Sequence, residues 1–147
     1  MPSDTARAEQ RIAADVTDVL ATIHDVASQP EWIPEIREVE VLESDDEGLA
    51  LRAALAAATS VGTDRYTLAY THRDDGVRWT LESGRLQTAQ EGLLTAEAAP
   101  DGSGDTVAAY ELTIATSLPL PGFVRSRVLK GLVTGTLTGL RDHLEKR

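Results

Sequence analysis

The stretch LPLPGFVRSRVLKGLVTGTLTGLRDHLEKR, residues 118–147, decides the fold of this chain. Proline fits the first turn of a helix but cannot continue one, so Pro119 and Pro121 mark a sharp start. No proline follows, and the remaining residues predict a single long helix reaching the end of the chain. Its apolar residues recur at helical spacing and form one stripe: Leu129, Leu132, Val133, Leu137, Leu140 and Leu144.

Three glycines, Gly131, Gly135 and Gly139, lie four residues apart on the flank of this stripe. Each costs about 1 kcal/mol relative to alanine inside a helix. By helical angle they lie at the edge of the stripe. We therefore expect them to allow close packing against a neighbouring element rather than to contact a ligand.

The composition limits the classes of function. The chain has 147 residues, of which 41% are hydrophobic and 26% charged, which predicts one globular domain. Its net charge of −10 argues against nucleic acid as a partner, because phosphate contacts need clustered Lys and Arg. There is no cysteine, no run long enough to span a membrane and no signal-peptide pattern, so we expect a cytoplasmic protein without stable membrane insertion.

The remaining chain predicts strands with two short helices near the start. Residues 1–7 are expected to be a flexible tail, and residues 8–147 a single domain. After a strand over 8–14, Asp15 is the predicted N-cap of an amphipathic helix, and Ser28 the cap of a second helix that Pro34 ends. Alternating segments then predict strands, with 49–59 the ambiguous one because its alanines and leucines also favour helix. The predicted strands are 36–43, 49–59, 63–72, 77–82, 85–97, with Gly92 as a possible bulge, and 106–116.

This order predicts an α+β domain. An antiparallel sheet needs one covered face, and only the last helix is long enough to cover it. We therefore expect a curved antiparallel sheet of six to seven strands wrapped around a long C-terminal helix, with two short helices after the first strand.

Several local motifs resemble one family across nearly the whole chain. They are Pro30-Glu31-Trp32-Ile33-Pro34, Val39-Glu40-Val41-Leu42-Glu43, Trp79-Thr80-Leu81-Glu82-Ser83-Gly84, Tyr110-Glu111-Leu112 and Leu118-Pro119-Leu120-Pro121-Gly122. With the element order, they resemble the helix-grip fold of the SRPBCC superfamily (START-like or Bet v 1-like). The nearest resemblance is to small actinobacterial proteins of the polyketide cyclase/dehydrase or coenzyme Q-binding type. The resemblance implies a cavity between sheet and last helix that accepts an apolar small molecule.

Strand alternation and the apolar stripe of the last helix indicate which residues are candidates to line that cavity. The ligand-binding candidates are Trp32, Tyr66, Tyr70, Trp79, Tyr110, Leu112, Leu129, Leu132, Val133 and Thr136. Alternatively, the aromatic residues among them are simply core. Small residues over 53–58 leave volume that either large neighbours or a ligand could fill. Arg125 and Arg127, with Lys130, crowd the start of the last helix and are candidates for a polar ligand group, or else they balance an acidic surface.

Catalytic signals are weak. A tyrosine or histidine in an apolar pocket can move a proton, which makes Tyr66, Tyr70 and His72 candidate catalytic residues. His24, His72 and His143 lack the spacing of a metal site, and no serine lies in a nucleophile elbow. No nucleotide-binding motif is present, and no metal or cofactor is expected.

Three functions follow from these observations. The first is binding or transport of a hydrophobic small molecule such as a lipid, quinone or polyketide-like compound, by a monomer or weak homodimer. The second is a polyketide aromatase/cyclase or dehydratase that uses cavity Tyr and His as acid-base groups. The third is a protein-interaction module whose partner packs on the glycine-lined flank of the last helix.

Overall fold

A computed structural model of the chain describes residues 3–59 and 62–146. Within this part the elements follow the expected order, one strand, two short helices, six strands and one long helix. Their bounds are β1 Ser3–Ile12, α1 Val16–His24, the 3-10 helix η1 Val26–Glu31, β2 Ile36–Ser44, β3 Ala50–Thr59, β4 Gly62–Arg73, β5 Gly76–Gly84, β6 Gln87–Ala98, β7 Thr106–Thr116 and α2 Gly122–Glu145.

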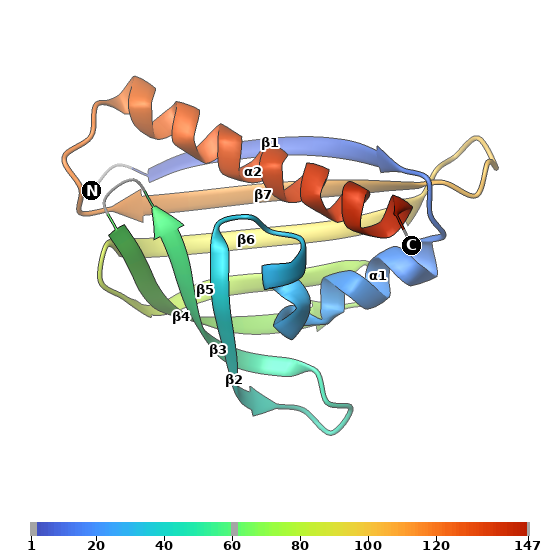
Figure 1. Ribbon diagram of the computed structural model, residues 1–147, viewed down its shortest axis with the longest axis horizontal. Coiled ribbons are helices and arrows are strands. Elements are labelled where there is room, and N and C mark those ends of the chain that lie inside the picture. The colour runs from blue at the N-terminus through green and yellow to red at the C-terminus, as the bar shows by residue number, and fades with distance from the viewer. Residues whose placement is uncertain (1–2, 60–61, 147) are drawn as a thin grey trace.

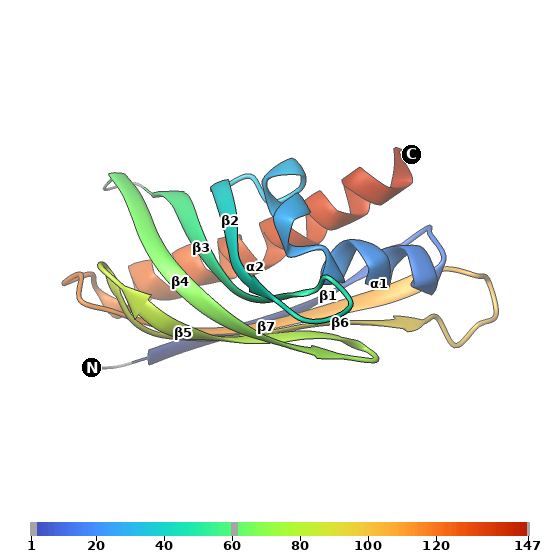
Figure 2. The same cartoon turned by 90° about the horizontal axis from the view of Figure 1, so that it is seen from below.

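The described strands form one antiparallel sheet in the order β1-β7-β6-β5-β4-β3-β2. Strand β1 pairs with β7 along its whole length, from Ser3 opposite Ala115 to Ile12 opposite Thr106. The sheet is strongly curved, and β2, β3 and β4 sweep up toward the side that carries the helices (Figure 2). The predicted helix-grip architecture is therefore confirmed.

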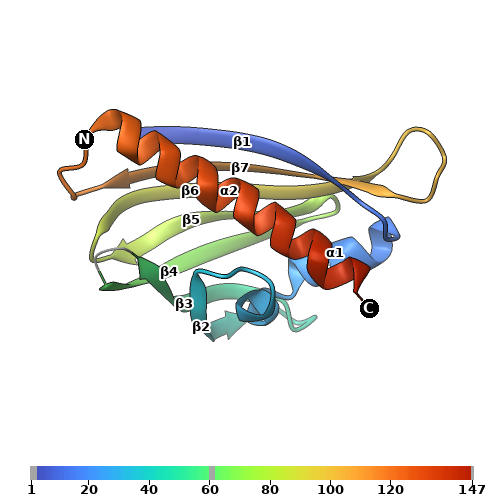
Figure 3. The same cartoon turned by 45° about the horizontal axis from the view of Figure 1, so that its top comes forward.

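Helix α2 lies diagonally across the concave face, over β1 and β7 (Figures 1 and 3). The predicted apolar stripe faces the sheet: Leu129, Val133, Leu137, Leu140 and Leu144 are buried, whereas Leu132 is half-buried. Helix α1 closes the same face over β5 and β6. Neither helix in the described part of the chain is both long and apolar enough to span a bilayer.

The three glycines of α2 have different surroundings. A Cβ atom at Gly139 would lie 1.8 Å from the carbonyl oxygen of Trp32, so the backbones of α2 and of the segment after η1 approach too closely for any side chain. At Gly135 the nearest atom to such a Cβ is a carboxylate oxygen of Glu35, at an ordinary 3.8 Å. At Gly131 no described atom lies within 4 Å. The expected close packing thus holds at Gly139 alone.

Two short-range predictions are confirmed. The side chain of Asp15 accepts a hydrogen bond from the amide of Thr17 and caps α1. The ambiguous alanine-rich segment is strand β3, because pairing with β2 and β4 on both sides outweighs the helix propensity of alanine and leucine.

Three other predictions need correction. The tail expected over 1–7 is not a tail from Ser3 onward, because β1 begins there and pairs with β7; residues 1 and 2 lie outside the described residues. Ser28 does not cap a helix: it lies inside η1, where its hydroxyl donates to the carbonyl of Asp25 and accepts from the indole of Trp32. The pairing of Gly92 with Trp79 and Leu112 is regular, so Gly92 is not a bulge.

Candidate functional site

A partly enclosed cavity of about 120 Å³ lies between the concave face of the sheet and α2. Strands β3 to β7 supply most of its wall, Leu132 and Thr136 supply the part on α2, and the segment between η1 and β2 supplies one end. Most of the wall is aliphatic or aromatic. The small side chain of Ala57 lies on the face that lines it, opposite Asp64, so part of the space that the alanines of β3 leave is cavity.

Aromatic rings form one side of the cavity. Trp79 and Tyr110 both line it, with ring centroids 5.6 Å apart, and Tyr70 packs behind Trp79 at 6.2 Å. Gly92 explains the position of the indole: a Cβ at residue 92 would lie 2.1 Å from an atom of the Trp79 ring. The indole ring of Trp79, which pairs with Gly92 across the two strands, therefore packs directly over the glycine, where any side chain would clash with it.

A row of polar side chains crosses the other side. The indole Nε1 of Trp79 donates to Gln90 Oε1 at 2.8 Å, Gln90 Nε2 donates to Gln87 Oε1, and Gln87 Nε2 donates to Asp64 Oδ2 at 3.0 Å. Because an indole can only donate, it sets the orientation of both amides. All the hydrogen bonds in this row run toward Asp64, whose carboxyl group is the final acceptor.

Three buried polar atoms near this row have no hydrogen-bond partner among the described residues: Asp64 Oδ1, Glu35 Oε2 and the hydroxyl of Tyr70. Asp64 is 4% exposed. Glu35 is held in place through its backbone, since its carbonyl accepts from the amide of Ala58 at 2.7 Å. Both acids line the cavity. Buried polar groups are normally paired, so the two free carboxyl oxygens are unusual features of the site.

The three tyrosines remain protonated at neutral pH. Burial raises the pKa of Tyr66, and the nearby Asp64 and Glu35 raise it further. Burial is also the main reason why the pKa values of Tyr70 and Tyr110 are raised. Each hydroxyl can therefore donate a hydrogen bond, for example to a carbonyl oxygen, but none is prepared to act as a base.

The structure divides the predicted ligand-binding residues into two groups. Six of them lie in the cavity wall: Tyr66, Trp79, Tyr110, Leu112, Leu132 and Thr136. The other four are buried but outside that wall: Trp32, Tyr70, Leu129 and Val133.

The candidate His72 lies away from the cavity and joins β4 to α1. Its Nε2 donates to the carbonyl of Ala50 at 2.7 Å, and its Nδ1 shares a hydrogen bond with Nδ1 of His24 at 2.8 Å. Burial, and then the neighbouring His72, lower the pKa of His24. This pair fastens α1 to the sheet.

The cations proposed to hold a polar ligand group are also outside the cavity wall. Arg125 forms an ion pair with Asp4 of β1 at 2.8 Å and donates to the carbonyl of Leu120 at 2.6 Å. It thereby ties the start of α2 to the sheet. Arg127 is exposed.

The polar residues of the cavity, Glu35, Asp64, Gln87 and Gln90, were not among the predicted site residues. A signal for two of them exists in the sequence, because Asp64 has the parity of Tyr66 in β4 and Gln90 has that of Leu94 in β6. Glu35 precedes β2 in an irregular segment, where no periodicity could indicate it.

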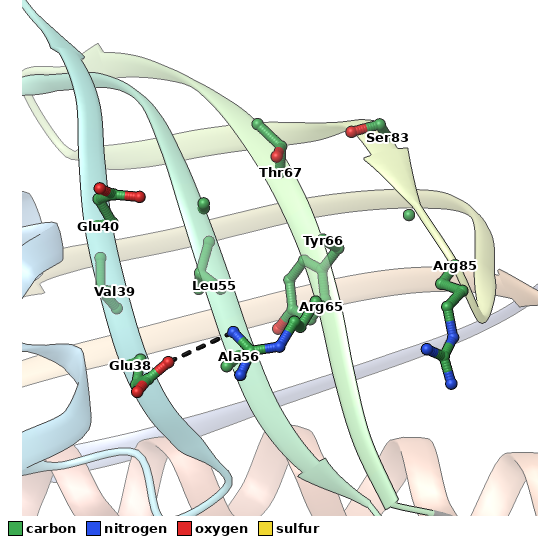
Figure 4. Close-up of a pocket in the computed structure, with 12 residues that line it drawn as sticks. Glu38, Val39, Glu40, Leu55, Ala56, Arg65, Tyr66, Thr67, Ser83 and Arg85 are labelled. Carbon is green, nitrogen blue, oxygen red and sulfur yellow. Dashed lines mark hydrogen bonds and ion pairs between the residues drawn. The ribbon is translucent and has the colours of Figure 1, made fainter.

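A second, wider hollow of about 740 Å³ lies open to solvent across β2, β3, β4 and the end of β5 (Figure 4). Its rim carries charges of both signs, including the pair of Arg65 and Glu38 at 3.4 Å. Leu55 and Tyr66 line both this hollow and the inner cavity. The inner cavity, with its aromatic wall and buried polar row, has the features of a small-molecule site, and the hollow does not.

The curved sheet, the long C-terminal helix and the cavity between them define a START-like domain. The chain belongs to the family described as "Polyketide cyclase / dehydrase and lipid transport", whose profile matches residues 4–147. No curated protein matches the chain at a significant level.

Solved structures with the same fold are numerous. A START superfamily protein from Mycobacterium smegmatis superposes with a TM-score of 0.86 at 19% identity, covering 97% of both chains. A protein of Thermus thermophilus gives 0.80 at 20% identity, covering 97% of this chain and 98% of the other. The ZhuI aromatase/cyclase from Streptomyces sp. R1128 gives 0.78 at 14% identity, covering 99% and 96%. At these identities the likeness concerns the fold.

Proposed function

We propose that this protein binds a small, largely apolar molecule in the cavity between the sheet and α2, as a carrier or sensor. The observation that carries the proposal is the cavity itself, which is walled by aromatic and aliphatic side chains and crossed by the Trp79–Gln90–Gln87–Asp64 row. A mostly apolar wall with a few fixed polar groups is the usual composition of ligand sites.

The volume of the cavity favours a ligand of about one ring. Drug-sized ligands occupy roughly 300–1,000 Å³, whereas an apolar cavity of about 150 Å³ accepts benzene. The cavity volume of about 120 Å³ is close to the second value. A quinone ring or a short acyl group fits this space, and a polycyclic compound would need the wall to move.

Two measurements test the proposal. Native mass spectrometry of freshly purified protein should show a bound small molecule that is lost on denaturation. In the Ala57→Leu variant, the larger side chain takes up cavity space and should prevent binding, because Ala57 lies opposite Asp64 on the face of the sheet that lines the cavity. Ala54→Leu is the matched control, because Ala54 is a half-buried alanine of the same strand that lines the open hollow instead. Equal binding by both variants would contradict the location of the site.

The tyrosines support a second candidate function, that of a polyketide-type cyclase or dehydratase. Tyr66 and Tyr110 line the cavity with protonated hydroxyls, which can polarise a substrate carbonyl. The ZhuI aromatase/cyclase shares the fold. Turnover of a linear polyketide analogue that disappears in Tyr66→Phe or Tyr110→Phe would favour this function, and unchanged turnover in Tyr66→Phe, Tyr110→Phe, Tyr70→Phe and His72→Ala would exclude it.

A further inference from the structure

The acids of the cavity point to the chemical class of its ligand, an inference that rests on the proposed function. Asp64 Oδ1 and Glu35 Oε2 are buried acceptors without a donor among the described residues. The amides of the polar row do not donate to Asp64 Oδ1, because Gln87 already donates to the other oxygen of Asp64 and Gln90 donates to Gln87. Two carboxylic acids of the cavity wall therefore each have an acceptor oxygen that no described donor satisfies.

The cavity also lacks a compensating charge. None of the described residues in its wall is a lysine, arginine or histidine, whereas two are carboxylic acids. Burying a carboxylate is costly unless a cation or several donors face it. A ligand that carries its own acid or phosphate would add a like charge to this space.

We propose that the ligand is a small amine, a one-ring or similarly compact apolar body with a protonated nitrogen that faces Asp64 and Glu35. An ammonium group has several N–H donors for the two unpaired carboxyl oxygens, and it supplies the positive charge that the wall lacks. The electron-rich faces of Trp79 and Tyr110, which border the same space, also favour a cation. The cavity of about 120 Å³ limits the apolar body to about one ring.

Four probes of nearly equal shape test this inference: benzylamine, benzyl alcohol, toluene and benzoate. Binding is measured by calorimetry and by the fluorescence of Trp79 in a Trp32→Phe background. Because a hydrogen bond to a charged group is about twice as strong as a neutral one, benzylamine should bind at least about tenfold more tightly than benzyl alcohol or toluene. Benzoate should bind most weakly.

Variants of the two acids locate the effect. In Asp64→Asn the new amide oxygen can still accept from Gln87, so the row is kept while the charge is removed. The preference for benzylamine over benzyl alcohol should fall by about tenfold, and Glu35→Gln should reduce it in the same direction. Asp74→Asn is the matched control: it removes the same charge from an exposed turn and should leave the preference unchanged.

Thermal unfolding separates a ligand-binding role from a structural one. If Asp64 serves the ligand, the ligand-free Asp64→Asn protein should unfold at the same or a higher temperature, because an incompletely paired buried acid has been removed. A clear loss of thermal stability would show that the acid is structural and would overturn its assignment to the ligand.

The outcomes also distinguish this inference from the proposed function. If toluene or benzoate binds as tightly as benzylamine, the cavity is a ligand site but the amine assignment is wrong. The assignment is equally wrong if Asp64→Asn and Glu35→Gln both keep the full preference. If none of the four probes binds, both the amine assignment and the proposal of a binding site for a one-ring ligand are wrong.

Discussion

The three glycines of α2 allow one substitution to be compared in three environments of a single helix. In each case Gly→Ala adds the same methyl group and gains about 1 kcal/mol of helix propensity. At Gly131 no described atom lies near the new Cβ, and at Gly135 the contact with Glu35 is an ordinary 3.8 Å. Both variants should therefore be stabilised by about 1 kcal/mol, which raises the midpoint of thermal unfolding by about 2–4 °C in a chain of this size.

Gly139→Ala should have the opposite effect. The new Cβ would lie 1.8 Å from the carbonyl oxygen of Trp32, whereas real Cβ atoms essentially never approach closer than 3.0 Å. The helix and the segment that carries Trp32 must therefore separate by about 1 Å or more, and a backbone atom cannot rotate away. Such overpacking costs about 3 kcal/mol at the upper end of the usual range. After the gain in propensity, the net loss is about 2 kcal/mol, or a decrease of about 4–8 °C.

Thermal unfolding followed by circular dichroism, together with urea unfolding, measures all three variants against the wild type. The informative quantity is the difference between Gly139→Ala and Gly131→Ala, about 3 kcal/mol, because helix propensity cancels in it. Equal stability of these two variants would refute the close approach of α2 to Trp32. A loss of stability in Gly131→Ala would instead refute the open environment assigned to that position.

Two further predictions concern the aromatic wall and the histidine pair. In Gly92→Ala the new methyl group would overlap ring atoms of Trp79, so the variant should lose about 1–3 kcal/mol of folding stability and show a changed Trp79 fluorescence. An unchanged emission spectrum would contradict the packing of the indole on Gly92. Because the pKa of His24 is lowered in the folded protein, this residue takes up a proton at higher pH in the unfolded chain than in the folded one. The contribution of neutral His24 to the free energy of unfolding is therefore complete above pH 6.5, the ordinary pKa of histidine, and is lost as the pH falls below it. His24→Asn should flatten the decrease in unfolding temperature between about pH 7 and about pH 5, and an identical slope in both proteins would show that the pair does not titrate in this range.

The sequence was a reliable guide to which residues are buried, and a poorer guide to which of them surround the cavity. Strand parity correctly places Tyr66, Trp79 and Tyr110 on inward faces, and all three line the cavity. Tyr70 has the same parity as Tyr66, yet it lies outside the wall. Alternation distinguishes two faces of a strand but carries no information on distance along the curved sheet, so it cannot separate core from cavity.

Charge patterns were the least informative signal. Arg125 suggested an anion site at the start of α2, but its guanidinium is used by Asp4 and by the carbonyl of Leu120. Asp4 is more than a hundred residues away in sequence, and the contact depends on β1 lying beside β7 at the edge near that helix end. Conversely, Glu35 lies in an irregular segment whose sequence gives no sign of the cavity, and its carbonyl accepts a hydrogen bond from the amide of Ala58 in β3.

The sequence by itself determined the order of the elements, the apolar stripe of α2 and the helix-grip class, because periodicity and turn residues act over a few neighbours. Through Gly131, Gly135 and Gly139 it also indicated that a neighbouring element packs closely against α2. Only the tertiary structure decided that Gly139 alone makes the close contact, and that Asp64 and Glu35 line one cavity, each with a buried oxygen that has no partner among the described residues. Those facts depend on the curvature of the sheet and on the angle at which α2 crosses it. Both are set by the packing of many distant residues at once, which no local pattern records.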